Sequence, residues 1–224
     1  MGSRQSGDIM SSKVWYVIPA RKGSKGLPGK NRKLFNYTAS TIPLEERKNV
    51  IVTSDDDYIL SRCAAFGILG HNRTIDLSND FASTRDVLID VVREFNICKN
   101  DIVVLLYLTY PERSWSDIDR AIQMIKNKKA NSLLCRKEIK TSPYLMMFEE
   151  SDLKGTKVIN HDLCRRQDYK KCFEMSHYVG AFKAGNLRDL DTNLWSRDTI
   201  FMTISNKIDV DHKSDLDQFL TEKK

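Results

Sequence analysis

Basic and glycine residues alternate in one short segment near the N-terminus, Pro19-Ala20-Arg21-Lys22-Gly23-Ser24-Lys25-Gly26-Leu27-Pro28-Gly29-Lys30-Asn31. Glycine lets the backbone approach an anion closely, and successive exposed N–H groups can form an anion-binding concavity. Arg21, Lys25 and Lys30 add fixed positive charge. The segment is therefore typical of a polyphosphate-binding loop, although a Gly- and Lys-rich stretch by itself is as often a solvated turn. It fits neither the Walker A pattern nor G-x-G-x-x-G.

Two carboxylates alternate near the other end of the chain, in Ile208-Asp209-Val210-Asp211. On an extended segment such residues point to the same side, because side chains repeat every two residues. Two like charges this close repel unless a cation lies between them, and hard oxygen ligands suit Mg²⁺. The pattern therefore indicates a magnesium site at Asp209 and Asp211, with a solvated loop or helix cap as the alternative. Asp215 is typical of the first turn of a final helix.

Strands and helices must alternate to position these groups. Apolar runs predict strands over residues 14–18, 49–54, 101–106 and 132–135. Helices are predicted to begin at the capping residues Asp55, Ser83 and Ser116. This order predicts an α/β fold with an open, mostly parallel sheet and helices on both faces. Ligands bind beyond the carboxyl ends of such strands, where the basic loop would lie.

Size and composition restrict the class of protein. The 224 residues, 41% of them hydrophobic, fit a single domain over residues 13–224 after a polar tail, residues 1–12, that we expect to be disordered. An inserted arm is expected at about residues 137–175, where the alternation breaks down. The net charge is +6, but the positive residues are too dispersed along the chain for a nucleic-acid interface. No apolar run is long enough to span a membrane. The five cysteines are odd in number and form no C-x-x-C pair, which favours reduced thiols in a cytoplasmic compartment.

The basic segment resembles the signature I-P-A-R-x-G-S-K-G-[IL]-P-x-K-N of the CMP-N-acylneuraminate cytidylyltransferase family. Residues 73–84, Arg-Thr-Ile-Asp-Leu-Ser-Asn-Asp-Phe-Ala-Ser-Thr, are similar to the family's R-P-x-[ED]-L-A-x-D-x-[AS]-S-[ST]. The resemblance implies a Rossmann-like fold of the nucleotide-diphospho-sugar transferase type. It implies Mg²⁺-dependent transfer of CMP from CTP to an acidic, sialic-acid-like sugar, with release of pyrophosphate. It also implies a homodimer formed with the help of the arm.

The resemblance assigns roles to individual residues. Arg21, Lys30 and Asp211 are the implied catalytic residues, and Asp209 and Asp211 the implied metal ligands. The implied nucleotide-binding residues are Ala20, Arg21, Ser24, Lys30, Asn31, Arg73, Ala82 and Thr84.

The sugar side departs from the family pattern. Thr109 matches it, but Tyr107 replaces a glutamine that helps bind the sugar acid, and His177 lies in a strand that reads N-G-[AS]-I-Y in the family. Arg166 and Gln167 match the family's R-Q-[DQ] pattern, and the resemblance implies that they bind substrate. The planar guanidinium of Arg166 suits a carboxylate, with an exposed arginine on a mobile arm as the alternative. Two alternatives therefore stay open. One is the same chemistry on another acid sugar, such as a pseudaminic, legionaminic or Kdo-like acid, and the other is a degenerate nucleotide-binding relative without catalysis.

Overall fold

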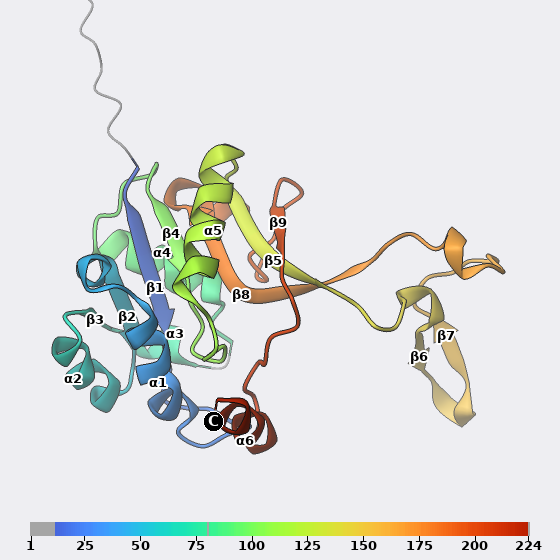
Figure 1. Ribbon diagram of the computed structural model, residues 1–224, viewed down its shortest axis with the longest axis horizontal. Coiled ribbons are helices and arrows are strands. Elements are labelled where there is room, and N and C mark those ends of the chain that lie inside the picture. The colour runs from blue at the N-terminus through green and yellow to red at the C-terminus, as the bar shows by residue number, and fades with distance from the viewer. Residues whose placement is uncertain (1–11, 80, 224) are drawn as a thin grey trace, which may run out of the picture.

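A seven-stranded sheet forms the centre of the protein in the computed structural model, which describes residues 12–79 and 81–223 (Figure 1). The strand order is β3-β2-β1-β4-β8-β5-β9. Only β8 runs antiparallel to its neighbours, β4 and β5, so the prediction of a mostly parallel sheet is confirmed. The strands are β1 (Val14–Pro19), β2 (Val50–Ser54), β3 (Leu69–Asn72), β4 (Ile102–Leu105), β5 (Ser132–Glu138), β8 (Phe173–Lys183) and β9 (Ile200–Thr203).

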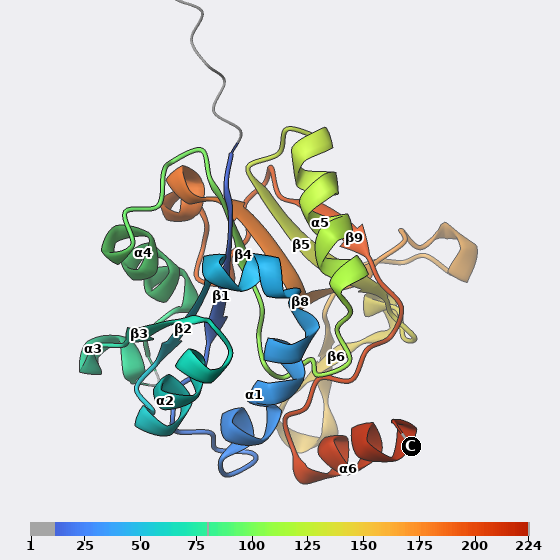
Figure 2. The ribbon, with the colours of Figure 1, turned by 60° about the vertical axis from the view of Figure 1, so that its left-hand side comes forward.

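Helices cover both faces of this sheet, as predicted. The main helices are α1 (Lys30–Thr41), α2 (Asp57–Ala65), α3 (Ile75–Ser78), α4 (Thr84–Glu94), α5 (Trp115–Asn127) and α6 (Lys213–Glu222). Buried residues of α1, α2 and α5 share one hydrophobic cluster, whereas α4 and the 3₁₀ helix η5 (Ala184–Asp189) belong to a second cluster. Figure 2 shows α4 and α5 on opposite sides of the sheet. Strands β2 and β4 are buried along their whole length because both faces are covered.

Two of the three predicted helix caps need correction. Ser83 caps α4 as expected, its hydroxyl accepting from the Asp86 N–H at 3.1 Å. The cap of α2 is Asp56 instead of Asp55, because the Asp55 carboxylate accepts from the Lys22 N–H at 2.7 Å. The cap of α5 is Ser114, whose backbone is extended, whereas Ser116 already lies inside the first helical turn.

The segment between β5 and β8 projects from the body as an arm (Figure 1). It starts where Glu138 pairs with Phe173, at the ends of the two strands. It carries the hairpin β6 (Met147–Glu149) and β7 (Gly155–Lys157), with the 3₁₀ helices η2 (Pro143–Leu145), η3 (Ser151–Leu153) and η4 (Arg166–Asp168). Several apolar side chains of the arm are exposed, including Met147, Phe148 and Leu153.

Two further sequence predictions concern the ends and the membrane. The predicted disordered tail, residues 1–12, lies outside the described residues except for Ser12. Throughout residues 12–79 and 81–223, no helix has both the length and the apolar character that a membrane crossing requires.

Candidate active site

The basic loop leads directly from β1 into α1. Lys30 and Asn31, predicted as the end of the loop, form the first turn of the helix. Gly29 precedes them with φ 68° and ψ 21°, a left-handed conformation that favours glycine. The Asn31 amide donates to the Arg21 carbonyl at 2.8 Å and so ties the two ends of the loop together. The loop therefore presents its cations beside the N-terminus of α1, whose helix dipole favours anions.

A cavity of about 270 Å³ opens at the carboxyl ends of the central strands. It brings together six residues predicted to bind nucleotide or substrate: Arg21, Asn31, Arg73, Ala82, Thr84 and Tyr107. Sequence reasoning missed four further lining residues: Pro19, Leu77, Asn79 and Val87. Leu77 and Val87 lie on the inner faces of α3 and α4, where an apolar residue is indistinguishable from core in the sequence.

Arg73 supplies a buried cation to this cavity. Its guanidinium donates to Thr53 on β2, to the hydroxyl at 3.3 Å and to the carbonyl at 3.0 Å. Burial lowers the pKa of Arg73, and the neighbouring charge of Asp55 opposes that shift. A buried guanidinium held by neutral oxygens attracts an anionic ligand strongly, because little water competes for it.

Asn79 lines the cavity and holds the turn that leads into α4. Its Oδ1 accepts from the backbone N–H groups of Phe81 at 2.8 Å and Ala82 at 3.0 Å, while its Nδ2 donates to the Asp76 carbonyl at 2.7 Å. Ala82 is thereby placed at the entry to α4, next to Thr84. The N-terminus of α4 faces the cavity through this turn.

Tyr107 lines the cavity and also contacts His177, a residue of the predicted sugar side. Its hydroxyl donates to the Thr84 hydroxyl at 2.6 Å, and its ring lies edge-on to His177 with centroids 5.8 Å apart. Burial raises the pKa of Tyr107 and lowers that of His177, where the charge of Asp209 opposes the shift. Within the described part of the chain, Nδ1 of His177 is buried and has no hydrogen-bond partner.

The carboxylates meet the basic loop from the C-terminal end of the chain. Lys30 Nζ lies 2.8 Å from Asp211 Oδ1. Residues 205–211 form no strand, contrary to the extended segment that we expected, because they cross irregularly from β9 to α6. The alternation is nevertheless present, since Val210 is buried between the exposed residues Asp209 and Asp211. The Val210 N–H donates to the Thr109 carbonyl at 2.8 Å and anchors the segment to the loop after β4.

The donor set suits a cation shared with a substrate. The described residues contain no cluster of three or more His, Cys, Asp or Glu side chains able to hold a metal alone. Mg²⁺ typically takes one or two carboxylates and completes its shell with phosphate oxygens and water. Asp209 and Asp211 beside a phosphate-type loop fit that pattern.

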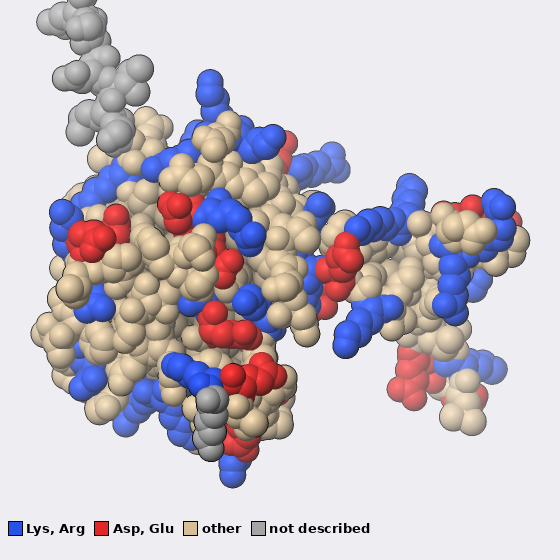
Figure 3. Space-filling model, in the orientation of Figure 1, with Lys and Arg blue, Asp and Glu red and all other residues tan. Residues whose placement is uncertain are grey.

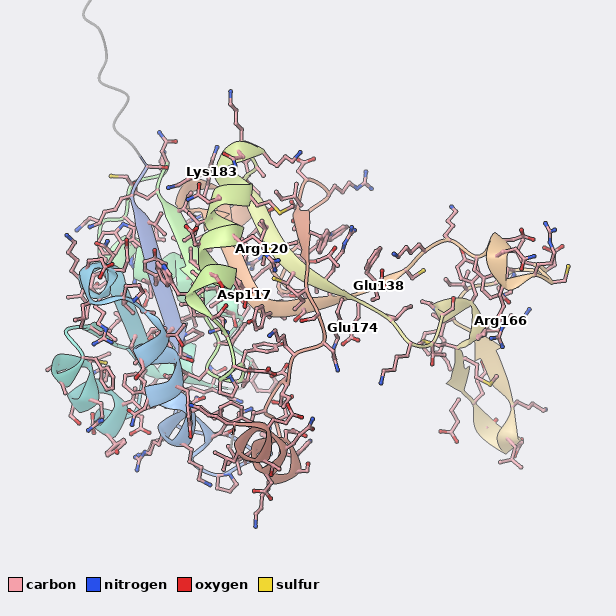
Figure 4. All side chains as sticks on the ribbon, in the orientation of Figure 1. Asp117, Arg120, Glu138, Arg166, Glu174 and Lys183 are labelled. Carbon is pink, nitrogen blue, oxygen red and sulfur yellow. The ribbon has the colours of Figure 1, made fainter. Side chains whose placement is uncertain are left out.

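The remaining predicted residues lie outside the cavity lining. Ala20 is fully buried and fixes the start of the loop by donating to the Thr53 carbonyl at 2.9 Å. Ser24 lies within the loop, half-buried. Arg166 and Gln167 lie on the arm, in η4, and Figure 4 shows Arg166 well away from the body of the molecule. Arg166 lines a separate cavity of about 480 Å³ with Glu138, Lys140 and Lys171. Lys and Arg are dispersed over body and arm on the face in Figure 3, with Asp and Glu between them.

Comparison with solved structures places this fold in a known class. The structure of CMP:2-keto-3-deoxy-manno-octonic acid synthetase complexed with CTP matches with a TM-score of 0.66, covering 95% of this chain and 100% of that chain at 18% identity. A 4-diphosphocytidyl-2C-methyl-D-erythritol synthase matches with a TM-score of 0.63, covering 95% and 97% at 13% identity. The sheet and its helices thus have the architecture of nucleotide-diphospho-sugar transferases.

Sequence comparison identifies the family. The profile described as "Cytidylyltransferase" matches residues 15–179, and the chain belongs to that family. The chain is 26% identical over 216 residues to "Post-translational flagellin modification protein B" of Campylobacter coli, covering 91% of this chain and 92% of the relative. It is 27% identical over 167 residues to an N-acylneuraminate cytidylyltransferase of Streptococcus agalactiae, covering 70% of this chain but only 40% of that relative.

Proposed function

We propose that this protein transfers CMP from CTP to a hydroxyl of an acidic sugar and releases pyrophosphate. The observation that carries the proposal is the meeting of one cavity, lined by Arg21, Asn31 and Arg73, with the adjacent Lys30–Asp211 pair. A cytidylyltransferase needs both parts, a pocket for an anionic nucleotide and charge beside the reacting phosphate. Membership of the cytidylyltransferase family supports the same conclusion.

The reaction is an in-line displacement. The acceptor oxygen forms a bond to the α-phosphorus of CTP, the bond from that phosphorus to the bridging oxygen breaks, and pyrophosphate leaves with the electron pair. The hydroxyl proton passes to solvent. Catalysis of this kind consists mainly of positioning and of stabilising charge as it develops.

Each group has a defined part in this proposal. Arg21 and Lys30 stabilise the triphosphate and its departing part, and Ser24 and the loop amides hold phosphate oxygens with Asn31 nearby. Arg73, Ala82 and Thr84 hold the cytidine portion. Asp209 and Asp211 would hold a magnesium ion, which would supply positive charge and would make the attacking hydroxyl more acidic.

Arg166 completes the site from a second subunit in this proposal. The arm carries Arg166 and Gln167 away from the cavity of their own chain (Figure 4). Exposed apolar side chains on the arm, such as Met147 and Phe148, suit burial against another copy. We therefore propose a homodimer in which each arm brings Arg166 to the acid group of the partner's sugar substrate.

We also propose a reducing, cytoplasmic compartment, because all five cysteines are free.

The acceptor is an N-acylneuraminate-like acid in our first proposal and another acid sugar in the second. The second is favoured by Tyr107, whose hydroxyl is engaged by Thr84 where the resembled family has a substrate-binding glutamine. The proteins similar in sequence or fold also include one named as a 2-keto-3-deoxy-manno-octonic acid synthetase.

The test is pyrophosphate release with CTP, Mg²⁺ and a panel of N-acylneuraminic, pseudaminic, legionaminic and Kdo acids, each with and without EDTA. Metal-dependent release with one acid supports the proposal and selects the acceptor. Absence of release with every acid, in a protein that still binds CTP by calorimetry, contradicts the proposed transfer to these sugars. Absence of CTP binding contradicts the nucleotide site itself.

A further inference from the structure

Gly26 lies against the carboxylate segment more closely than any other residue type could. A Cβ atom at this position would lie 2.5 Å from the Asp211 carbonyl oxygen and 3.1 Å from His212 Nδ1. Backbone conformation does not require the glycine, because its φ lies outside the left-handed region. The requirement is one of space, since the basic loop and the backbone of Asp211 touch here.

Two further residues, Asp215 and Thr109, hold the same stretch of backbone from other directions through three hydrogen bonds. Asp215 Oδ2 accepts from the Asp211 N–H at 2.9 Å and from the His212 N–H at 2.7 Å. The Val210 N–H donates to the Thr109 carbonyl at 2.8 Å. The backbone on both sides of the Asp211 side chain thereby contacts the basic loop and is hydrogen-bonded to α6 and to the loop after β4.

We propose that Gly26 and Asp215 are positioning residues that set the distance between the phosphate-binding loop and the Asp211 carboxylate. The inference rests on the proposed function, because it concerns how the two halves of that site are aligned. Lys30 and Asp211 are 2.8 Å apart although each belongs to a separate segment. A displacement of about 1 Å can cost on the order of a hundredfold in such a site. A side chain at position 26 would force such a displacement, because the obstructing atom is a backbone oxygen.

Alanine substitutions at two glycines, one inside the loop and one far from it, test this spacing. Gly26→Ala pushes the loop away from Asp211, whereas at Gly70 on β3 an added Cβ meets its nearest atom, Leu60 Cδ2, at 3.5 Å, so Gly70→Ala is the control. The measurement is CTP affinity by calorimetry, in EDTA and in Mg²⁺, without any acceptor sugar. We expect Mg²⁺ to increase the affinity of the unchanged chain and of Gly70→Ala by on the order of tenfold. Gly26→Ala should lose most of that gain and keep its affinity in EDTA.

Asp215 provides an independent pair of variants that introduces no steric clash. Asp215→Ala removes the acceptor of both N–H groups, while Asp215→Asn keeps an acceptor oxygen at the same place. We expect the alanine variant to lose the Mg²⁺-linked gain and the asparagine variant to regain most of it. If Asp215 had only a structural role, both variants would have a lower melting temperature. Their CTP affinity would then change by the same factor in Mg²⁺ and in EDTA.

The results separate this inference from the proposed function. A full Mg²⁺-linked gain in Gly26→Ala or Asp215→Ala overturns the positioning role. A loss of affinity in EDTA that is as large as the loss in Mg²⁺ in Gly26→Ala also overturns it, because the methyl group would then disturb CTP binding by the loop itself. Absence of CTP binding in the unchanged chain instead refutes the nucleotide site.

Discussion

Arg32 and Asp56 form a two-bond ion pair, with Nε 2.7 Å from Oδ2 and Nη2 2.8 Å from Oδ1. Asp56 is buried and also caps α2 by accepting from the Tyr58 N–H at 3.1 Å. The hydrogen bond from Arg32 holds the pKa of Asp56 below its usual range. The pair therefore joins the helix that begins at the phosphate-type loop to the helix beside it.

Replacing Asp56 should give a pH-dependent loss of stability. The lowered pKa means that ionised Asp56 stabilises the fold above its unfolded pKa of about 3.9, and that this contribution is lost as pH falls through the lower folded pKa. Asp56→Asn should reduce the free energy of unfolding by about 2 kcal/mol near neutral pH. Urea unfolding as a function of pH measures this difference, which should narrow below about pH 4. The exposed neighbour Asp57 supplies the control, Asp57→Asn; an equal, pH-independent loss in both variants contradicts the expectation.

Removing either partner of the Lys30–Asp211 pair should slow turnover without unfolding the protein. Asp211→Ala and Lys30→Ala each remove a charge beside the proposed reacting phosphate, and Arg21→Ala removes one from the loop. We expect kcat to fall by about a hundredfold or more in each case. Pyrophosphate release measures kcat, and circular dichroism verifies the fold. The control is Asp217→Ala, which changes an exposed aspartate of α6. Near-normal turnover in both Asp211→Ala and Arg21→Ala would refute their catalytic assignment.

Arg73 should govern nucleotide affinity. Arg73→Ala deletes the buried cation of the cavity, and we expect CTP to bind about a hundredfold more weakly, as for loss of a charge-assisted contact. Arg73→Lys keeps the charge but cannot donate to both Thr53 oxygens as a fork, so an intermediate affinity is expected. Calorimetry with CTP measures both variants. Arg93→Ala removes an exposed arginine of α4 outside the cavity and should bind CTP normally.

Arg113 should contribute more to stability than to binding. It is buried, and its guanidinium donates at 2.7 Å to the carbonyls of both Tyr178 and Tyr107. Burial lowers its pKa to about 10. Arg113→Lys replaces the two guanidinium nitrogens that reach the two carbonyls with one ammonium nitrogen, so we expect the free energy of unfolding to fall by about 3 kcal/mol. Urea denaturation tests this, and a loss no larger than that of the partly exposed Arg120→Lys would contradict it.

The grouping of the proposed nucleotide-binding residues around one cavity could be anticipated because they lie in two short, continuous motifs. Arg73, Ala82 and Thr84 reach one cavity through a single turn and helix start, so local sequence order nearly determines their geometry. The predicted caps of α2 and α5 were wrong because two residues able to cap a helix lie close together in the sequence. For α2, only the hydrogen bond from the Lys22 N–H to Asp55 distinguishes Asp55 from Asp56.

Contacts between distant segments were not predictable from the sequence. The Lys30–Asp211 pair joins residues separated by 181 positions, and it depends on the path of the chain from β9 to α6. The contact of Gly26 with Asp211 depends on the same path. A glycine required by space looks identical in sequence to one required by backbone conformation, as at Gly29. The position of Arg166 likewise follows from the direction of the arm, which composition does not specify.

The contact between the basic loop and the segment that carries Asp211 determines when this part of the structure can form during synthesis. A ribosome adds Lys30 early and Asp211 181 residues later, after every strand of the sheet. A nascent chain that ends after α4 already contains Arg73, Ala82 and Thr84, but Asp209 and Asp211 have not yet been synthesised. The Lys30–Asp211 pair can therefore form only after almost all of the described chain has been synthesised.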